Sequence, residues 1–335
     1  MFIAKDFDQF KNCFVKQLRD MLCDDELGAF ILVLANSQQC ELLSEELSDD
    51  LENTFVTLKN NFASISQNAA QDDVDVFKKL QAISLKDIPV WQNKTIGHWQ
   101  VSYNAMRQLR PARASSQSFS SIRQDFDENR FHFNKPFLRP EILWQGEHLN
   151  NKLRILYNKF PFSDYHLLIA VSPEENSVQL LTRETHQLIY SLTQSSAKIS
   201  PGFSVGFNSL AAGASINHLH FQGFVREQGF PIEADNWLHN GGEDEYPLNV
   251  KRFADAETSW DYINRLTEQD RAFNCLYRKN NCYVIPRQYQ GSVELPDWLQ
   301  GAGWLDVAGV MTVSDEKIFD AIDEPSVTSA LGLLR

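Results

Sequence analysis

Three polar side chains alternate along one short stretch of the chain, His218-Leu-His-Phe-Gln222. Residues two apart in an extended strand share a face, so His218, His220 and Gln222 are expected side by side. A neutral imidazole can attack phosphorus, and a carboxamide can donate hydrogen bonds to phosphoryl oxygens. The pattern is therefore compatible with covalent chemistry on a phosphate. It is also compatible with half of a metal site, or with two surface histidines on an edge strand.

The segment before these residues predicts a strand and a small-residue loop. Phe203 to Asn208 alternates apolar and small residues as a strand does, and Gly213 interrupts the pattern as a turn would. Backbone N–H groups of such a loop can hold phosphate oxygens. A strand, a loop and a second strand are thus expected to place the imidazoles beside an anion.

This stretch resembles the histidine-triad superfamily, whose pattern is a strand, a Gly/Ser loop and then His-x-His-x-His. A Gln as third member resembles the branch of nucleotidyltransferases and nucleotide phosphorylases: hexose-1-phosphate uridylyltransferases, diadenosine tetraphosphate phosphorylases and GDP-hexose phosphorylases. The run Gly206-Phe-Asn-Ser-Leu with Ala214-Ser-Ile-Asn-His-Leu-His-Phe-Gln222 is most similar to the GDP-hexose phosphorylases (GDP-L-galactose and GDP-D-glucose types).

The resemblance implies a role for each matching residue. His220 would be the nucleophile that carries the nucleotide as a phosphoramidate, and Gln222 would hold the phosphoryl oxygens without acting as an acid. His218 would brace the site. The loop match implies phosphate-binding roles for Asn208, Gly213 and Ser215.

Segments upstream of the motif add further candidates. Asn158-Lys-Phe-Pro161 resembles the nucleotide-binding strand pair of the diadenosine tetraphosphate phosphorylases and uridylyltransferases, which implies that Asn158 and Lys159 lie near the nucleotide. His166 heads the second strand of that pair and is open to a structural or a functional reading. Arg130-Phe-His-Phe-Asn-Lys135 alternates like a half-buried strand, and its resemblance implies a phosphate contact by Lys135. Arg287 is expected as a charge at the rim.

Composition restricts the class of protein. The chain has 335 residues and a formal net charge of −13, which argues against nucleic acid or an anionic membrane as partner. The longest apolar run, residues 27–35, is too short for a bilayer, and the N-terminus lacks the order of a signal peptide. Five cysteines without a Cys-x-x-Cys pair are typical of reduced thiols. A soluble cytoplasmic protein is predicted.

The expected architecture is an α+β protein: a helical N-terminal region over residues 1–98, followed by a histidine-triad-like nucleotidyltransferase domain with antiparallel sheet over 99–335. Apolar residues at intervals of three and four predict the first helices. A helix before the motif, a hairpin over 273–288, a strand over 304–313 and a C-terminal helix complete it. Uridylyltransferases often carry zinc on a Cys-x-x-Cys pair that is missing here, so no metal or other cofactor is expected.

The sequence therefore supports one leading hypothesis and two rivals. The leading one is phosphorolysis of a GDP-hexose by inorganic phosphate, giving GDP and hexose 1-phosphate. A diadenosine tetraphosphate phosphorylase is the second, favoured by Asn158-Lys-Phe-Pro161. The third is a catalytically silent nucleotide-binding module. Base, sugar and oligomeric state are open at this level.

Overall fold

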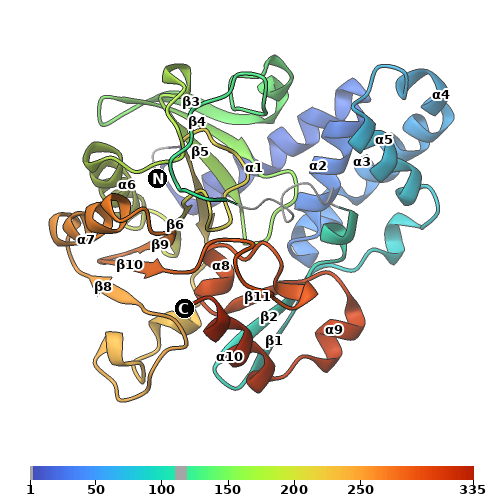
Figure 1. Ribbon diagram of the computed structural model, residues 1–335. Coiled ribbons are helices and arrows are strands. Elements are labelled where there is room, and N and C mark those ends of the chain that lie inside the picture. The colour runs from blue at the N-terminus through green and yellow to red at the C-terminus, as the bar shows by residue number, and fades with distance from the viewer. Residues whose placement is uncertain (1–2, 110–118) are drawn as a thin grey trace.

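The computed structural model describes residues 3–109 and 119–335, and within them an eight-stranded antiparallel sheet forms the centre (Figure 1). Its strand order is β3-β4-β5-β7-β6-β9-β10-β8. The strands are β3 (Ile142–His148), β4 (Asn151–Tyr157), β5 (Leu167–Val171), β6 (Phe203–Asn208), β7 (His220–Val225), β8 (Lys251–Phe253), β9 (Phe273–Arg278) and β10 (Asn281–Pro286). The predicted combination of helices with an antiparallel sheet is confirmed.

A three-stranded sheet pairs β2 (Trp99–Tyr103) with β1 (Gln92–Ile96) antiparallel and with β11 (Val310–Val313) parallel. The single strand predicted over 304–313 is wrong in its first half, where α8 (Trp304–Val307) replaces it. The backbone N–H of Gly303 donates to Oδ2 of Asp306 at 2.8 Å, which closes a helical turn before the strand begins. Helices α9 (Glu316–Ala321) and α10 (Glu324–Leu333) follow.

The N-terminal region is helical, as predicted. It contains α1 (Phe7–Met21), α2 (Leu27–Ser37), α3 (Glu41–Asn60), α4 (Phe62–Ile65) and α5 (Gln71–Leu80). The apolar run 27–35 lies in α2 and is almost wholly buried. No helix in the described part of the chain has the length and apolar character that crossing a membrane requires.

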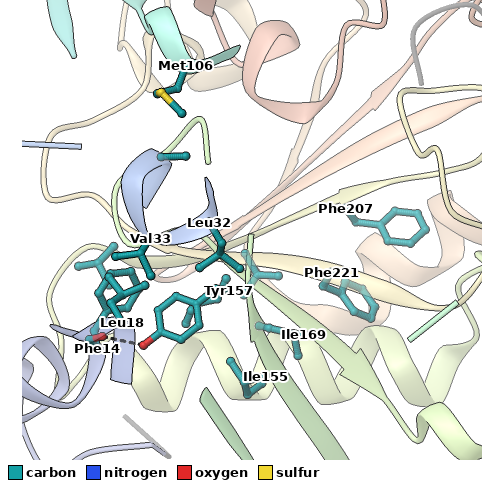
Figure 2. Packing of buried hydrophobic residues seen from close by; sticks show 14 of the residues in the cluster. Phe14, Leu18, Leu32, Val33, Met106, Ile155, Tyr157, Ile169, Phe207 and Phe221 are labelled. Carbon is teal, nitrogen blue, oxygen red and sulfur yellow. Dashed lines mark hydrogen bonds between the residues drawn. The ribbon is translucent and has the colours of Figure 1, made fainter. Parts of the chain in front are cut away.

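These helices share one hydrophobic core with the large sheet. Phe14 and Leu18 of α1 pack with Ile155 and Tyr157 of β4, as Figure 2 shows. The Tyr157 hydroxyl donates to the backbone oxygen of Phe14 at 2.7 Å, so its buried polar atom is paired. The helical region is thus fastened to the strand that leads into Asn158. A domain boundary between residues 98 and 99 stays a prediction.

Two further helices pack beside the sheet, α6 (Arg183–Ser196) and α7 (Ala256–Glu268) (Figure 1). The helix predicted just before the motif is α6, and Thr182 caps it by accepting from the N–H of Thr185. Leu188, Ile189 and Leu192 form its buried stripe. The chain therefore runs from α6 into β6, in the order that the sequence predicts.

The strand predicted over residues 130–135 is wrong, because this segment is a loop. The backbone groups of Phe133 bond to side chains instead of a neighbouring strand. The N–H of Phe133 donates to Nδ1 of His218 at 3.0 Å, and the carbonyl of Phe133 accepts from Nη1 of Arg154 at 2.7 Å. The alternation in the sequence reflects a single buried ring, Phe133, with Phe131 43% exposed.

The hairpin that carries the motif leaves no room at one position. Gly206 of β6 lies opposite Gln222 of β7, and the indole of Trp304 covers it. A Cβ on Gly206 would lie 2.4 Å from Cδ2 of Trp304, far inside van der Waals contact. Both strand and indole belong to packed layers, so neither can yield freely.

We therefore expect Gly206→Ala to lower the free energy of unfolding by about 1–3 kcal/mol, the usual cost of overpacking a core. Gly332→Ala is the matched control, since a Cβ there meets nothing within 4 Å in α10. It should be neutral or stabilise by up to about 1 kcal/mol. Urea denaturation followed by circular dichroism measures both. Equal stability of the Gly206→Ala protein and wild type would contradict this packing.

Candidate active site

One cavity draws its walls from distant parts of the chain: the 158–162 segment, the β6–β7 loop, the start of β7 and residues 298–306. Most of the predicted site residues line it together: Asn158, Lys159, Asn208, Gly213, Ser215, His220 and Gln222. His218 lies behind His220 and does not line the cavity. The structure therefore brings these seven together from two segments, 158–159 and 208–222, that are 49 residues apart in sequence.

His220 presents one nitrogen to this cavity. Its Nδ1 lies 2.9 Å from the backbone oxygen of His218, which can only accept, so the ring proton is on Nδ1. Nε2 then holds a lone pair and forms no hydrogen bond within residues 3–109 and 119–335. The side chain is 5% exposed, and burial lowers the pKa of His220 from 6.5 to about 4. The imidazole is therefore neutral at physiological pH, with a lone pair on Nε2.

Gln179 fixes the backbone around His220. Its Oε1 accepts from the N–H of His220 at 2.9 Å. Its Nε2 donates to the carbonyl of His220 at 3.0 Å and to that of Asn208 at 2.9 Å. This fully buried amide ties the end of β6 to the start of β7 where the strands have separated. Nothing in the sequence marked Gln179, because its bonds are all to backbone groups.

His218 uses both ring nitrogens on the protein. Nδ1 accepts from the N–H of Phe133 at 3.0 Å, and Nε2 donates to the backbone oxygen of Pro173 at 3.0 Å. The pKa of His218 is lowered to about 4, chiefly by burial. It was expected inside the strand, but β7 begins at His220, because the N–H of Leu219 donates to Ser177 in a loop. His218 orients the carbonyl that fixes the tautomer of His220.

Gln222 has its carbonyl oxygen doubly occupied. Oε1 accepts from Nε1 of Trp304 at 2.7 Å and lies 3.1 Å from Nε2 of His166. Since Nδ1 of His166 accepts from the N–H of Phe162 at 3.3 Å, the proton of His166 is on Nε2 and also points at Gln222. Burial lowers the pKa of His166 to about 3, so this ring is neutral. The amide NH₂ of Gln222 is left facing the cavity.

The end of β6 and the loop that follows it supply a second carboxamide and a tight turn. Oδ1 of Asn208 accepts from Nδ2 of Asn274 and from the backbone N–H of Trp304, each at 2.7 Å. Gly213 has φ +98°, and a Cβ there would lie 2.7 Å from the carbonyl oxygen of Ala302. Only glycine meets both conditions without strain. Ser215 lies exposed in the lining.

Asn158 and Lys159 are held by the N-terminal helices. The carbonyl of Asn158 accepts from Nδ2 of Asn36 in α2 at 2.9 Å, and the Lys159 ammonium lies 2.5 Å from a carboxylate oxygen of Asp73 in α5. Both side chains line the cavity. An anion that reached Lys159 would therefore share it with Asp73.

Lys135, like His218, is a predicted site residue that does not line the cavity. Its ammonium donates to the backbone oxygen of Glu128 at 2.9 Å and is exposed. Arg107 does line the cavity, with its guanidinium carbon 5.0 Å from the centre of the Phe162 ring. Arg110 and Arg113, two further basic residues that follow Arg107 closely in the sequence, lie outside the described residues.

Sequence reasoning misplaced Arg287, which is fully buried and not at the rim. Its Nη1 donates to the carbonyl of Ala302 at 2.7 Å, and burial lowers its pKa to about 10. Because Arg287 anchors the loop that leads into Trp304, it supports the site without lining the cavity. Trp304 itself was missed, because an aromatic residue in an apolar run predicts core packing and not a polar contact.

Among the described residues there is no group of three or more His, Cys, Asp or Glu side chains that could hold a metal ion. The ring nitrogens of His218 and His220 bond to backbone carbonyl oxygens and to one backbone N–H group.

Comparison with known proteins shows which families and structures this chain is similar to. Residues 97–224 match the family model described as GDPGP1-like, N-terminal domain. GDP-D-glucose phosphorylase 1 of Danio rerio is 36% identical over 124 residues, 36% of this chain and 35% of that protein. The Homo sapiens protein of that name is 34% identical over 131 residues, 36% and 33% respectively. GDP-L-galactose phosphorylase 2 of Arabidopsis thaliana is 33% identical over 129 residues, 33% and 30%.

The alignments thus span about a third of the curated relatives. A crystal structure of yeast Ap4A phosphorylase in complex with Ap4A superposes with a TM-score of 0.51 at 17% identity, covering 73% of this chain and 88% of that one. The resemblance predicted from the sequence is confirmed: residues 97–224 match the GDPGP1-like N-terminal model, about a third of the chain aligns with GDP-hexose phosphorylases, and the fold is similar to that of yeast Ap4A phosphorylase.

Proposed function

We propose that this protein is a nucleotidyltransferase of the phosphorylase type, which splits a GDP-hexose with inorganic phosphate into GDP and hexose 1-phosphate. One observation carries the proposal: Nδ1 of His220 is bonded to a carbonyl, and its neutral Nε2 is turned into a cavity beside the NH₂ of Gln222. The relatives named as GDP-hexose phosphorylases support the substrate.

The reaction proceeds in two displacements at one phosphorus. Nε2 of His220 donates its lone pair to the α-phosphorus, and the bond from that phosphorus to the bridging oxygen breaks. Hexose 1-phosphate leaves with the electron pair. An oxygen of inorganic phosphate then attacks the same phosphorus, the N–P bond breaks, and GDP leaves a neutral imidazole behind. Because the first nucleophile is uncharged, only one step brings two anions together.

Gln222 decides between transfer and hydrolysis in this scheme. Its NH₂ can donate to the non-bridging oxygens, but a carboxamide cannot protonate the phosphoramidate. The intermediate therefore persists until phosphate arrives. Asn208, Gly213 and Ser215 would hold the remaining phosphoryl oxygens, and Asn158 with Lys159 would contact the nucleotide. Lys135 has no part in this scheme. A cytoplasmic location fits the five cysteines, which are all free thiols.

Phosphorolysis of diadenosine tetraphosphate is the alternative, supported by the fold shared with the yeast enzyme. Incubation with GDP-glucose, GDP-L-galactose and diadenosine tetraphosphate, each with and without phosphate, separates the two reactions by product. Phosphate-dependent release from the adenine dinucleotide alone would replace the proposed substrate.

His220→Asn should abolish the covalent step while leaving the fold intact. We expect wild-type protein to retain label from a nucleotide labelled at its α-phosphorus, and the variant to retain none. The variant's turnover should drop by about 10³-fold or more, as for loss of a nucleophile elsewhere. Lys135→Ala is the matched control, since this residue does not line the cavity. It should label and turn over as wild type does.

Two outcomes would contradict this proposal, the first in its choice of nucleophile and the second in its assignment of an enzymatic activity. Unimpaired labelling of His220→Asn would move the nucleophile elsewhere. Binding of nucleotides by wild-type protein, without label and without phosphate-dependent release from any of the three substrates, would favour a catalytically silent binding module.

The pH dependence of labelling follows from the lowered pKa of His220. An ordinary histidine would gain its proton, and lose its lone pair, as pH falls through about 6.5. Here the folded-state pKa is about 4, so His220 stays deprotonated down to that pH. The single-turnover labelling rate, measured without phosphate, should be flat from pH 8 to about 5 and fall only below. A fall by half near pH 6.5, with circular dichroism unchanged, would contradict the assignment.

A further inference from the structure

Two carboxamides face the cavity, and both have the same polarity. The oxygen of Gln222 accepts from Trp304 and His166, and the oxygen of Asn208 accepts from Asn274 and Trp304. A carbonyl oxygen has two lone pairs, so both acceptors are saturated. Neither NH₂ group is hydrogen-bonded within the described ranges, and both residues line the cavity. The two side chains present donors there and no acceptors.

One residue, Trp304, donates a hydrogen bond to the oxygen of each carboxamide. Trp304 gives its backbone N–H to Oδ1 of Asn208 and its indole N–H to Oε1 of Gln222, each at 2.7 Å. An amide could otherwise rotate by half a turn and exchange its oxygen and nitrogen at little steric cost. Against a fixed N–H donor, that rotation would bring two donors together. Trp304 thus makes one orientation of each carboxamide favourable.

Trp304 is itself held rigidly. Its side chain is fully buried, and its ring is stacked on Phe224 with centres 4.5 Å apart and an interplanar angle of 10°. Gly206 also lies against the indole, near its Cγ, Cδ2 and Cε2 atoms, with no space for a methyl group. The preceding loop is fastened by Arg287 through the carbonyl of Ala302. The N–H groups of Trp304 therefore have fixed positions before any ligand enters.

We propose that Trp304 is a positioning residue that sets both carboxamides, so that Gln222 and Asn208 form a preorganised pair of donors for one phosphoryl group. Reversed amides would put two carbonyl oxygens against phosphoryl oxygens and repel them. Donors fixed in advance cost no reorganisation when charge develops, which is how such groups accelerate transfer. The inference rests on the proposed function, since it takes the cavity to be the site of nucleotidyl transfer.

Trp304→Phe tests this, because it removes the indole N–H and keeps a ring against Phe224. The labelling rate should fall by about 10-fold or more, below the roughly 100- to 1000-fold that follows deletion of an oxyanion donor. Trp237→Phe is the matched control. Trp237 lies in the same hydrophobic cluster and its buried indole donates to the carbonyl of Pro231 at 2.7 Å, remote from both amides. Its loss should leave the labelling rate unchanged.

A double-mutant cycle separates positioning from packing. If the indole acts through Gln222, then Trp304→Phe should have little further effect once Gln222→Met has removed the amide. A loss of packing would instead add its full effect in that background. Full additivity, or equal losses in Trp304→Phe and Trp237→Phe, would overturn the inference while leaving the proposed function in place.

If wild-type protein turns over none of the substrates, the proposed function is wrong. The inference about Trp304 is then tested by measuring ligand binding. Titration calorimetry with GMP and AMP, compared with guanosine and adenosine, then isolates the phosphoryl group. The inference predicts that Trp304→Phe weakens binding of a nucleoside monophosphate about 10-fold or more and leaves that of its nucleoside unchanged. Equal weakening of both, or no binding of either monophosphate by wild type, would overturn it.

Discussion

The hydrogen bond from Nδ1 of His220 to the carbonyl of His218 decides what this site can do. It places the only proton of a neutral ring on the nitrogen that faces the protein, and leaves a lone pair on the nitrogen that faces the cavity. Much of the surrounding structure keeps that bond in place. Gln179 holds the backbone of His220, while Phe133 and Pro173 hold the ring of His218.

The same principle recurs at Gln222 and Asn208: the oxygen of each amide is paired, so that its NH₂ is left for a ligand. Leaving a buried donor or acceptor without a partner costs about 1–3 kcal/mol, so these pairings are strongly preferred. His166 and Trp304 together occupy the oxygen of Gln222 and leave its NH₂. The N-terminal helices contribute in the same way, since Asn36 in α2 fixes the backbone at Asn158. They shape the site although the family resemblance does not reach them.

The sequence was most informative where local periodicity or turn chemistry determines structure. The first helices, the capped helix α6, the β6–β7 hairpin with Gly213 and the pair β4–β5 could all be predicted, because apolar spacing and turn residues are local properties. His220 and Gln222 could be predicted to share a face by the period of a strand. Fold class and family resemblance followed from these segments and their order.

What could not be predicted depends on contacts between distant segments. Phe133 alternates as a strand residue would, yet its N–H belongs to a histidine eighty-five residues away. The sequence predicts that Trp304 is a core residue, and it is one. Its two N–H groups, however, donate to Asn208 and Gln222 only because the two sheets pack together. Arg287 was predicted to be a surface charge. The sequence alone does not show that its guanidinium donates a hydrogen bond to a carbonyl group in the interior. Lys135 bonds to the carbonyl of Glu128 and Lys159 pairs with Asp73, and no local sequence pattern indicates either partner.

The most direct test of this account is the tautomer of His220 itself. Nitrogen-15 NMR on protein with labelled histidine, with His220→Asn used to assign the signals, reports which ring nitrogen carries the proton. The account predicts a protonated Nδ1 and an unprotonated Nε2 in free protein at every pH from 5 to 8. A proton on Nε2, or an imidazolium ion at pH 6, would contradict it.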